Sequence, residues 1–171
     1  MHTKRKLAAG LGALCAPALV LASVTPASAH GYINSPPSRQ AQCAANTVPC
    51  GEIKWEPQSV EGPKGLTSCS GGNARFRDLD DDSKGWKVSD VSSSQAFTWR
   101  LTAPHRTSTW QYFVDGRKVK EINDGGRQPP TTVTHTVDFG GITGRHKMLA
   151  VWNIYDTANA FYACVDINIR G

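Results

Sequence analysis

From residue 96 to the end of the chain, apolar and polar residues alternate in several separate stretches. Alternation with a period of two is typical of strands that bury one face and expose the other. The alternating stretches are 97–102, 132–139 and 161–169, while residues 148–154 are almost continuously apolar. Because no amphipathic helix of useful length accompanies them, the sequence predicts a mainly β fold, with the strands arranged as an antiparallel sandwich.

Residues 30–75 differ from this pattern. They are rich in Pro, Gly, Ser, Asn and Gln and show little periodicity. Such a composition is typical of a long loop with at most a helical turn or two. We therefore expect one extended loop region near the N-terminus of the sandwich.

The first 29 residues have the three parts of a secretory signal peptide. Basic residues 4–6 precede the apolar run 7–24, and Ala-Ser-Ala at 27–29 supplies a small-x-small cleavage site. A membrane anchor is the alternative, but Gly and Pro interrupt the apolar run and no second hydrophobic segment follows. We expect cleavage after Ala29, an extracellular protein without membrane contact, and one mature domain of residues 30–171.

Removal of the signal changes the charge of the chain. Three basic residues leave and no acidic one does, so the net charge falls from +5 to +2. Nucleic-acid binding selects for dense positive charge, which the mature chain lacks. We expect a monomer that does not bind nucleic acid.

The mature chain retains four cysteines, because Cys15 leaves with the signal. An even number of cysteines in an exported chain predicts two disulfides. Of the three possible pairings, the short spacing between Cys43 and Cys50 favours their pairing, which leaves Cys69 with Cys164. Zinc is the rival use of four cysteines, but the chain has no Cys-x-x-Cys pair.

The acidic run 78–82 invites a calcium interpretation, because Asp78, Asp80 and Asp82 match the first half of a calcium-binding loop. However, Ser83 stands where such a loop needs Gly, and Ser89 where it needs a bidentate Glu. We expect a solvated acidic turn instead.

His30 is the residue with the clearest chemical potential. The motifs of serine hydrolases, phosphate loops and zinc proteases are absent, and His135 and His146 fit structural and surface positions in predicted strands. Cleavage would make His30 the first residue, with a free amine whose reference pKa is about 7.7–8. Amine, imidazole and a second imidazole form a T-shaped set of three nitrogens, and tetragonal nitrogen sites favour copper(II).

The mature chain resembles the bacterial chitin-type lytic polysaccharide monooxygenases, copper enzymes once called chitin-binding proteins. The resemblance extends in order along nearly the whole mature chain. The segments that carry it are His30–Arg39 (HGYINSPPSR), Trp55–Gly62 (WEPQSVEG), Phe97–His105 (FTWRLTAPH), Trp110–Phe113 (WQYF) and Ala150–Tyr162 (AVWNIYDTANAFY).

The resemblance implies a copper site in which His30, through amine and ring, and His105, through its ring, hold one ion. Phe161 would lie at one axial face of the ion and Ala103 would crowd the other, while Glu61 would position the oxygen species by hydrogen bonding. The plainer alternatives are core packing for Phe161 and a surface loop carboxylate for Glu61.

The resemblance also implies an immunoglobulin- or fibronectin-III-like sandwich with a flat polar face that binds crystalline chitin. An exposed indole on that face would stack on a sugar ring, and polar neighbours would bond hydroxyls and acetamides. The residues of this face are Trp55, Glu56, Ser59, Thr102, Asp156 and Asn159.

The implied activity is oxidative cleavage of insoluble chitin at its surface. It would use one copper ion, an external electron donor, and oxygen or hydrogen peroxide as the oxidant. Oxidation at the anomeric carbon of chitin is the first expectation, and cellulose is the second substrate. A non-catalytic chitin-binding module that assists hydrolases and a copper carrier are the alternatives from other classes.

Overall fold

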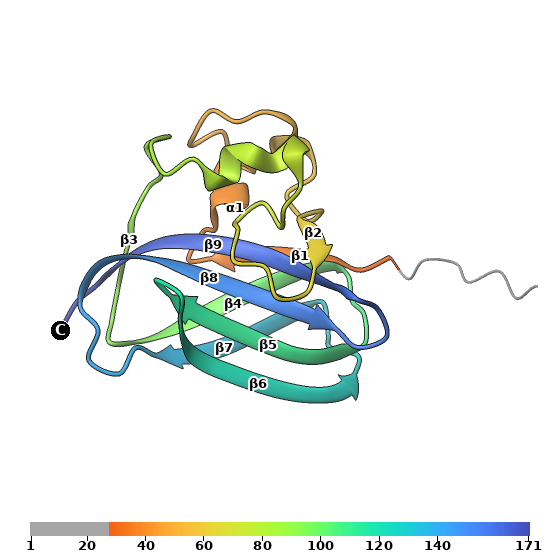
Figure 1. Ribbon diagram of the computed structural model, residues 1–171. Coiled ribbons are helices and arrows are strands. Elements are labelled where there is room, and N and C mark those ends of the chain that lie inside the picture. Colours follow the sequence, from red (N-terminus) through yellow and green to blue (C-terminus); the bar gives the residue numbers. More distant parts are fainter. Residues whose placement is uncertain (1–27) are drawn as a thin grey trace, which may run out of the picture.

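The computed structural model describes residues 28–171, so residues 1–27 of the predicted signal peptide lie outside the described residues. Its strands form two sheets that pack as a sandwich (Figure 1). The smaller sheet has the order β1-β4-β7, with strands β1 (His30–Ser35), β4 (Ser94–Ala103) and β7 (Thr132–Asp138). The larger sheet has the order β2-β9-β8-β5-β6, with strands β2 (Glu61–Pro63), β9 (Asn159–Ile169), β8 (Gly144–Ile154), β5 (Thr107–Val114) and β6 (Arg117–Arg127).

Every pairing along these two sheets is antiparallel, which confirms the predicted sandwich. The short strand β3 (Ser89–Val91) departs from the rule, because it pairs with the end of β9 in parallel. No helix within residues 28–171 has the length and apolar character needed to cross a membrane.

The alternation in β4 shows how the sequence builds the core. Phe97, Trp99 and Leu101 are buried between the sheets, while Arg100 and Thr102 are exposed on the outer face. Burial of each large side chain is worth about 1.5–3 kcal/mol, so a shift of the strand by one residue would lose this stabilisation. The hydrophobic pattern therefore fixes the register of the small sheet.

Strand β9 is buried on both faces. Phe161, Ala163 and Val165 belong to the core between the sheets, whereas Tyr162 and Cys164 belong to a second core beneath the helical region. This explains why β8 and β9 contain long apolar runs, since a strand covered on both sides gains from apolar residues at every position.

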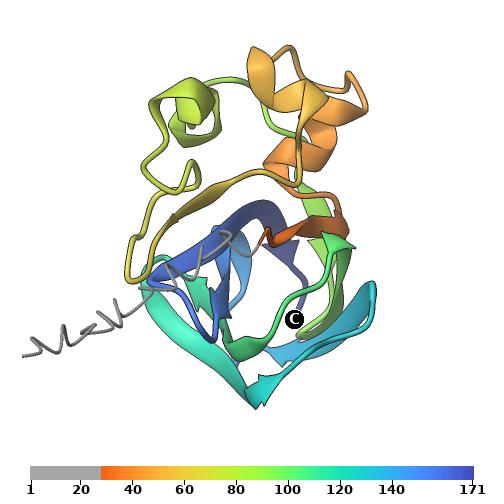
Figure 2. The same cartoon turned by 90° about the vertical axis from the view of Figure 1, so that its right-hand side faces the viewer.

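The N-terminal region covers the outer face of β9 with short helices (Figures 1 and 2). They are α1 (Arg39–Ala44), η1 (Glu52–Trp55) and η2 (Ala74–Asp80), the last two being 3-10 helices. Ser38 caps α1 by accepting a hydrogen bond from Ala41 N at 3.3 Å. Both predicted disulfides are present: Cys43–Cys50 within the region and Cys69–Cys164 between it and β9.

A buried arginine adds a polar attachment between this region and the sheet. Arg39 donates two hydrogen bonds of 2.8 Å to the two carboxylate oxygens of Asp166 on β9, and a third to Leu79 O. Its guanidinium also pairs with Asp82 and lies 5.1 Å from the ring centroid of Trp86. The bidentate geometry satisfies a charge that would otherwise be costly to bury.

The sequence analysis was wrong about one region and missed two strands. Residues 30–75, expected to be one long loop with at most a helical turn or two, contain the strands β1 and β2 and the short helices α1 and η1, and the strands β5 and β6 were not predicted. The acidic run is exposed at residues 80–82, as predicted, and its carboxylates also make contacts that were not predicted. Asp78 accepts a hydrogen bond from Gly51 N, Asp80 accepts one from Ser70 N, and Asp82 pairs with Arg39 and Lys147. These carboxylates serve as separate attachments because they point to different partners.

Candidate metal centre and surrounding face

Sheet register brings two histidines to the same end of the small sheet. His30 is the first residue of β1 and pairs with Ala103, the last residue of β4. His105 follows two residues later, before β5 begins. This end of the sandwich is the one at which the grey trace joins β1 in Figure 1, and it lies opposite the C-terminus.

A glycine allows β1 to lie close against its neighbours. A Cβ atom at Gly31 would be 2.5 Å from Leu101 Cδ2 and 3.1 Å from Arg100 O, so the Leu101 side chain at least would have to move. Gly31 N also donates a hydrogen bond of 3.0 Å to Gln58 O. The close approach fixes the backbone next to His30.

Phe161 forms the inner wall behind His30. Its side chain has no exposed surface, and its ring centroid is 6.1 Å from that of His30, with the two rings tilted by 53°. Trp152 packs against the other part of the ring at 5.2 Å. Phe161 is thus a core residue that also contacts His30, so its two predicted roles are compatible.

His105 is held by an aspartate of the β8–β9 loop. Its Nε2 lies 2.7 Å from Asp156 Oδ1, and the hydrogen bond from the ring holds the pKa of Asp156 below its usual range. A metal bound through Nε2 would displace this hydrogen bond, whereas one bound through Nδ1 would leave it in place. A carboxylate that orients a ligand imidazole is a common feature of metal sites.

Two residues of β9 fix the position of Glu61. It pairs with Phe161 in the β2–β9 register, and its Oε1 accepts a hydrogen bond of 2.7 Å from Asn159 Nδ2. The carboxylate itself is exposed. Register therefore ties Glu61 to the same strand positions that carry Phe161 and Asn159.

Trp55 is the most exposed large hydrophobic residue of the described chain, with 78% of its surface accessible. Lys54 Nζ lies 4.4 Å from its ring centroid, and Glu56 is paired with Arg75. Two backbone hydrogen bonds link this segment to Glu61: Ser59 N donates to Glu56 O, and Glu61 N donates to Ser59 O. Thr102 is also exposed, near the end of β4.

The donor set fits a copper ion only if the chain terminus contributes. Within residues 28–171 no three His, Cys, Asp or Glu side chains converge in a way that could hold a metal. The two imidazoles of His30 and His105 need a third nitrogen, which the amine of His30 would supply after cleavage. Three neutral nitrogens suit copper(II).

The uncleaved chain lacks that amine. Ala29 is buried in the core cluster, and Ser28 Oγ lies 3.0 Å from His30 Nδ1. The nitrogen of His30 is then part of a peptide bond, and one ring nitrogen has a hydroxyl group as its neighbour. Removal of residues 1–29 would free both nitrogens.

The other two histidines have their own partners. His135 is half-buried, its Nδ1 lies 2.7 Å from Tyr112 Oη, and burial lowers its pKa. His146 is the third residue of β8, and its hydrogen bond with Asp115 raises its pKa. The structural and surface roles predicted for these residues agree with these surroundings.

The sequence analysis missed two features at this end of the sandwich. It assigned Asp156 to the polysaccharide face but not to His105, and it gave no role to Tyr155, whose side chain is 49% exposed. A polar residue just after a buried strand is too common to signal a contact with a histidine 51 residues earlier. An aromatic residue at the start of the same loop was the available signal for Tyr155.

Comparison with known proteins gives one consistent family. A family profile described as "Lytic polysaccharide mono-oxygenase, cellulose-degrading" matches residues 30–167. A lytic chitin monooxygenase of Streptomyces ambofaciens is 60% identical over 172 residues, covering 100% of both chains.

Solved structures agree with the sequence comparison. A lytic polysaccharide monooxygenase of Jonesia denitrificans superposes with a TM-score of 0.80 at 52% identity, covering 82% of this chain and 100% of that one. The CBM33 protein of Bacillus amyloliquefaciens, solved in complex with Cu(I), gives a TM-score of 0.71 at 28% identity, covering 82% of this chain and 100% of that one.

Proposed function

Because this chain belongs to the lytic polysaccharide mono-oxygenase family, we propose that it cleaves crystalline chitin oxidatively with one copper ion. The observation that carries the proposal is the pair His30 and His105 at one end of the sandwich, with the predicted cleavage site directly before His30.

We assign the copper ligands to the His30 amine, the His30 ring and the His105 ring. Bound copper would supply one-electron redox chemistry, with electrons from an external donor and oxygen or hydrogen peroxide as the oxidant. The relative solved with Cu(I) supports this choice of metal.

The residues around the ligands would control access. Phe161, fully buried behind His30, would keep water and other ligands from one side, and Ala103 would limit the space beside His105. Glu61, fixed by Asn159, would offer a carboxylate that accepts hydrogen bonds from a bound oxidant. The C–H bond at the anomeric carbon would be hydroxylated: one oxygen atom of the oxidant would enter the new hydroxyl group and the other would leave as water, with two electrons from the external donor when oxygen is the oxidant. The hydroxylated carbon would then expel the neighbouring sugar as an alcohol, which breaks the glycosidic bond and leaves a lactone.

The proposed substrate is chitin, with cellulose as the second candidate. The family profile is described as cellulose-degrading, whereas the relative that is 60% identical is named a chitin monooxygenase. We give more weight to the relative, because it matches the whole chain rather than the features common to the family.

A flat binding face suits this kind of substrate, since a crystal surface cannot enter a deep pocket. We propose that the face consists of residues from three separate segments around the ligands, and that the protein is secreted so that it can reach the polymer. The face residues are Trp55, Glu56, Ser59, Thr102, Asp156 and Asn159.

The proposal is tested by incubating the mature, copper-loaded chain with chitin and, separately, with cellulose, in the presence of ascorbate. Mass spectrometry of the soluble products should find oligosaccharides oxidised at the anomeric carbon from chitin. Oxidised products from cellulose but not from chitin would refute chitin as the substrate. Tight binding to chitin without any oxidised product would favour the non-catalytic binding module.

We expect Trp55→Ala to weaken chitin binding about tenfold. Stacking of an aromatic face is worth about 0.5–1.5 kcal/mol beyond the burial of its area, and 1.4 kcal/mol corresponds to a factor of ten. Because the ring is exposed, the melting temperature and the copper affinity should hardly change. Binding isotherms on chitin measure the effect, with Trp55→Phe as the control that keeps a ring. A large fall in melting temperature with unchanged binding would contradict it.

A further inference from the structure

Only three large hydrophobic residues within residues 28–171 are strongly exposed: Trp55, Val88 and Tyr155. Val88 directly precedes β3, which pairs with the last residues of β9, Ile167–Ile169, and so lies at the far end of the sandwich. Tyr155 lies at the start of the β8–β9 loop, next to the proposed metal centre. Tyr155 belongs neither to the proposed copper ligands nor to the proposed chitin-binding face, so its exposure has a cause still to be found.

The ring of Tyr155 is held in place by its neighbours. Arg106 Cζ lies 4.7 Å from the ring centroid, and Tyr155 N donates a hydrogen bond of 2.8 Å to Arg106 O. Arg106 Nε donates to Gly126 O at 2.9 Å, which fixes the guanidinium. A Cβ atom at Gly126 would be 3.1 Å from three ring atoms, so the absence of a side chain there gives the ring its seat.

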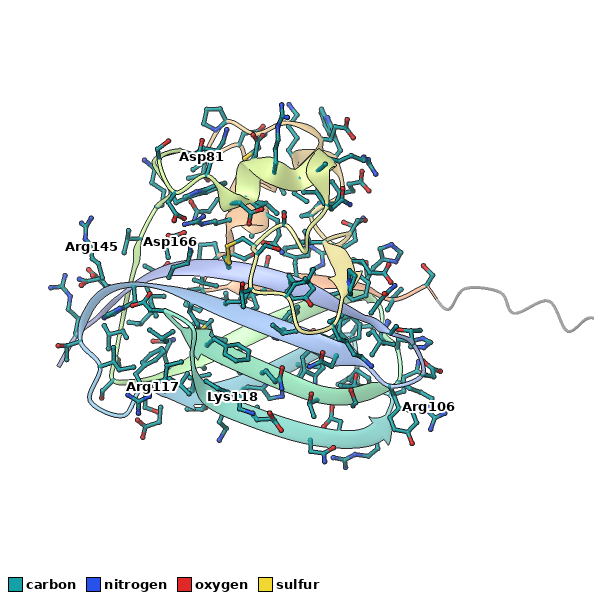
Figure 3. All side chains as sticks on the ribbon, viewed as in Figure 1. Asp81, Arg106, Arg117, Lys118, Arg145 and Asp166 are labelled. Carbon is teal, nitrogen blue, oxygen red and sulfur yellow. A yellow bond between two sulfur atoms is a disulfide. The ribbon has the colours of Figure 1, made fainter. Side chains whose placement is uncertain are left out.

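This fixed ring is linked to His105, a proposed copper ligand, through the sequence neighbours of both residues. Arg106 follows His105 in the chain, and Tyr155 precedes Asp156, whose Oδ1 lies 2.7 Å from His105 Nε2. Figure 3 shows Arg106 at the end of the sandwich at which the grey trace joins the structure. Tyr155 therefore belongs to the same end of the molecule as the proposed copper ligands.

Trp55 reaches this end from the other edge of the large sheet. Its segment leads through Ser59 into β2, which is one edge strand, whereas Gly126 lies on β6, which is the other. The sheet order β2-β9-β8-β5-β6 thus separates the two exposed aromatic rings, with the strands that lead to Asp156 and His105 between them.

We propose that Tyr155, seated on Arg106 and Gly126, is a second sugar-stacking platform that extends the chitin-binding face toward β6. The proposal rests on the proposed function, since it concerns the same polysaccharide surface. A ring that is already fixed loses little conformational freedom on binding, so its exposed surface can stack on a pyranose ring at low entropic cost. With Trp55 and Tyr155 on two sides, the polymer would be held across the metal rather than beside it.

Binding of the metal-free mature protein to chitin tests the platform without relying on catalysis. We expect Tyr155→Ala and Tyr155→Leu to weaken binding about fivefold, because Leu fills space but has no flat ring. Tyr155→Phe should bind as the unchanged protein does. Val88→Ala is the matched control, an exposed apolar residue at the far end, and should have no effect.

The outcomes separate this inference from the proposed function. If Tyr155→Leu binds chitin as well as the unchanged protein does, Tyr155 is not a stacking platform. The same follows if Tyr155→Ala has a lower melting temperature but binds chitin normally per folded molecule, since the ring would then serve only in packing. If Trp55→Ala weakens binding while all Tyr155 variants bind normally, the platform fails and the proposed function stands. If the unchanged protein does not bind chitin, the proposed function itself fails.

Discussion

The mature chain carrying His105→Ala should lose the copper(II) spectrum of the native site and release no oxidised oligosaccharides from chitin. Removal of this ring leaves only the two nitrogens of His30. Loss of groups that merely orient a ligand costs about 10–100-fold in metal affinity, so loss of a ligand should cost more than about 100-fold. The fold should persist, because His105 lies in the turn between β4 and β5 and not in the core. Electron paramagnetic resonance and calorimetric titration measure the result.

The control for this variant is His146→Ala. His146 lies near the start of β8 and pairs with Ile167 near the end of β9, and so lies at the opposite end of the sandwich. It should keep the copper spectrum and the activity. If His105→Ala left the resonance signal unchanged, another residue such as His135 would have to be the ligand.

A mature chain that retains one extra residue before His30 should lose most of its copper affinity. The extra residue turns the terminal amine into a peptide nitrogen, which does not bind copper(II) readily at neutral pH. In the uncleaved chain the preceding residue is also buried, because Ala29 packs in the main core cluster. Calorimetric titration of both forms at one pH measures the difference.

An extra residue after Gly171 is the matched control. The C-terminus lies at the opposite end of the sandwich from His30 (Figure 1), so this extension should leave copper binding unchanged. Equal affinities for the native and the N-terminally extended chain would rule out the amine as a ligand.

The strands that could be predicted are those in which burial alternates or is continuous. β4 and β7 alternate in the sequence because one face of each packs into the core, whereas β8 and the first half of β9 are apolar at nearly every position because both of their faces are covered. β5 was hidden by a register shift between Thr107 and Thr109, which breaks the period of two. β6 is an exposed edge strand whose charged residues resemble a loop.

The sequence could identify the residues of the site but not how they are arranged in space. Motifs in the sequence named His30, His105, Glu61 and Phe161, yet their proximity depends on pairings between distant strands. His30 pairs with Ala103, and Glu61 pairs with Phe161, across separations of 73 and 100 residues. Local patterns carry no information on such pairings, and for the same reason the contact between His105 and Asp156 and the seat of Tyr155 emerged only from the folded chain.

The most direct test of the central claim is mass spectrometry of soluble products from chitin, with copper and ascorbate present and with a reductant-free control. We expect oligosaccharides oxidised at the anomeric carbon, released only when both copper and reductant are supplied. Identical, non-oxidised products in the presence and absence of reductant would show hydrolysis, and binding without any products would show adhesion alone. Either result would contradict the assignment of this chain as an oxidative chitin-cleaving enzyme.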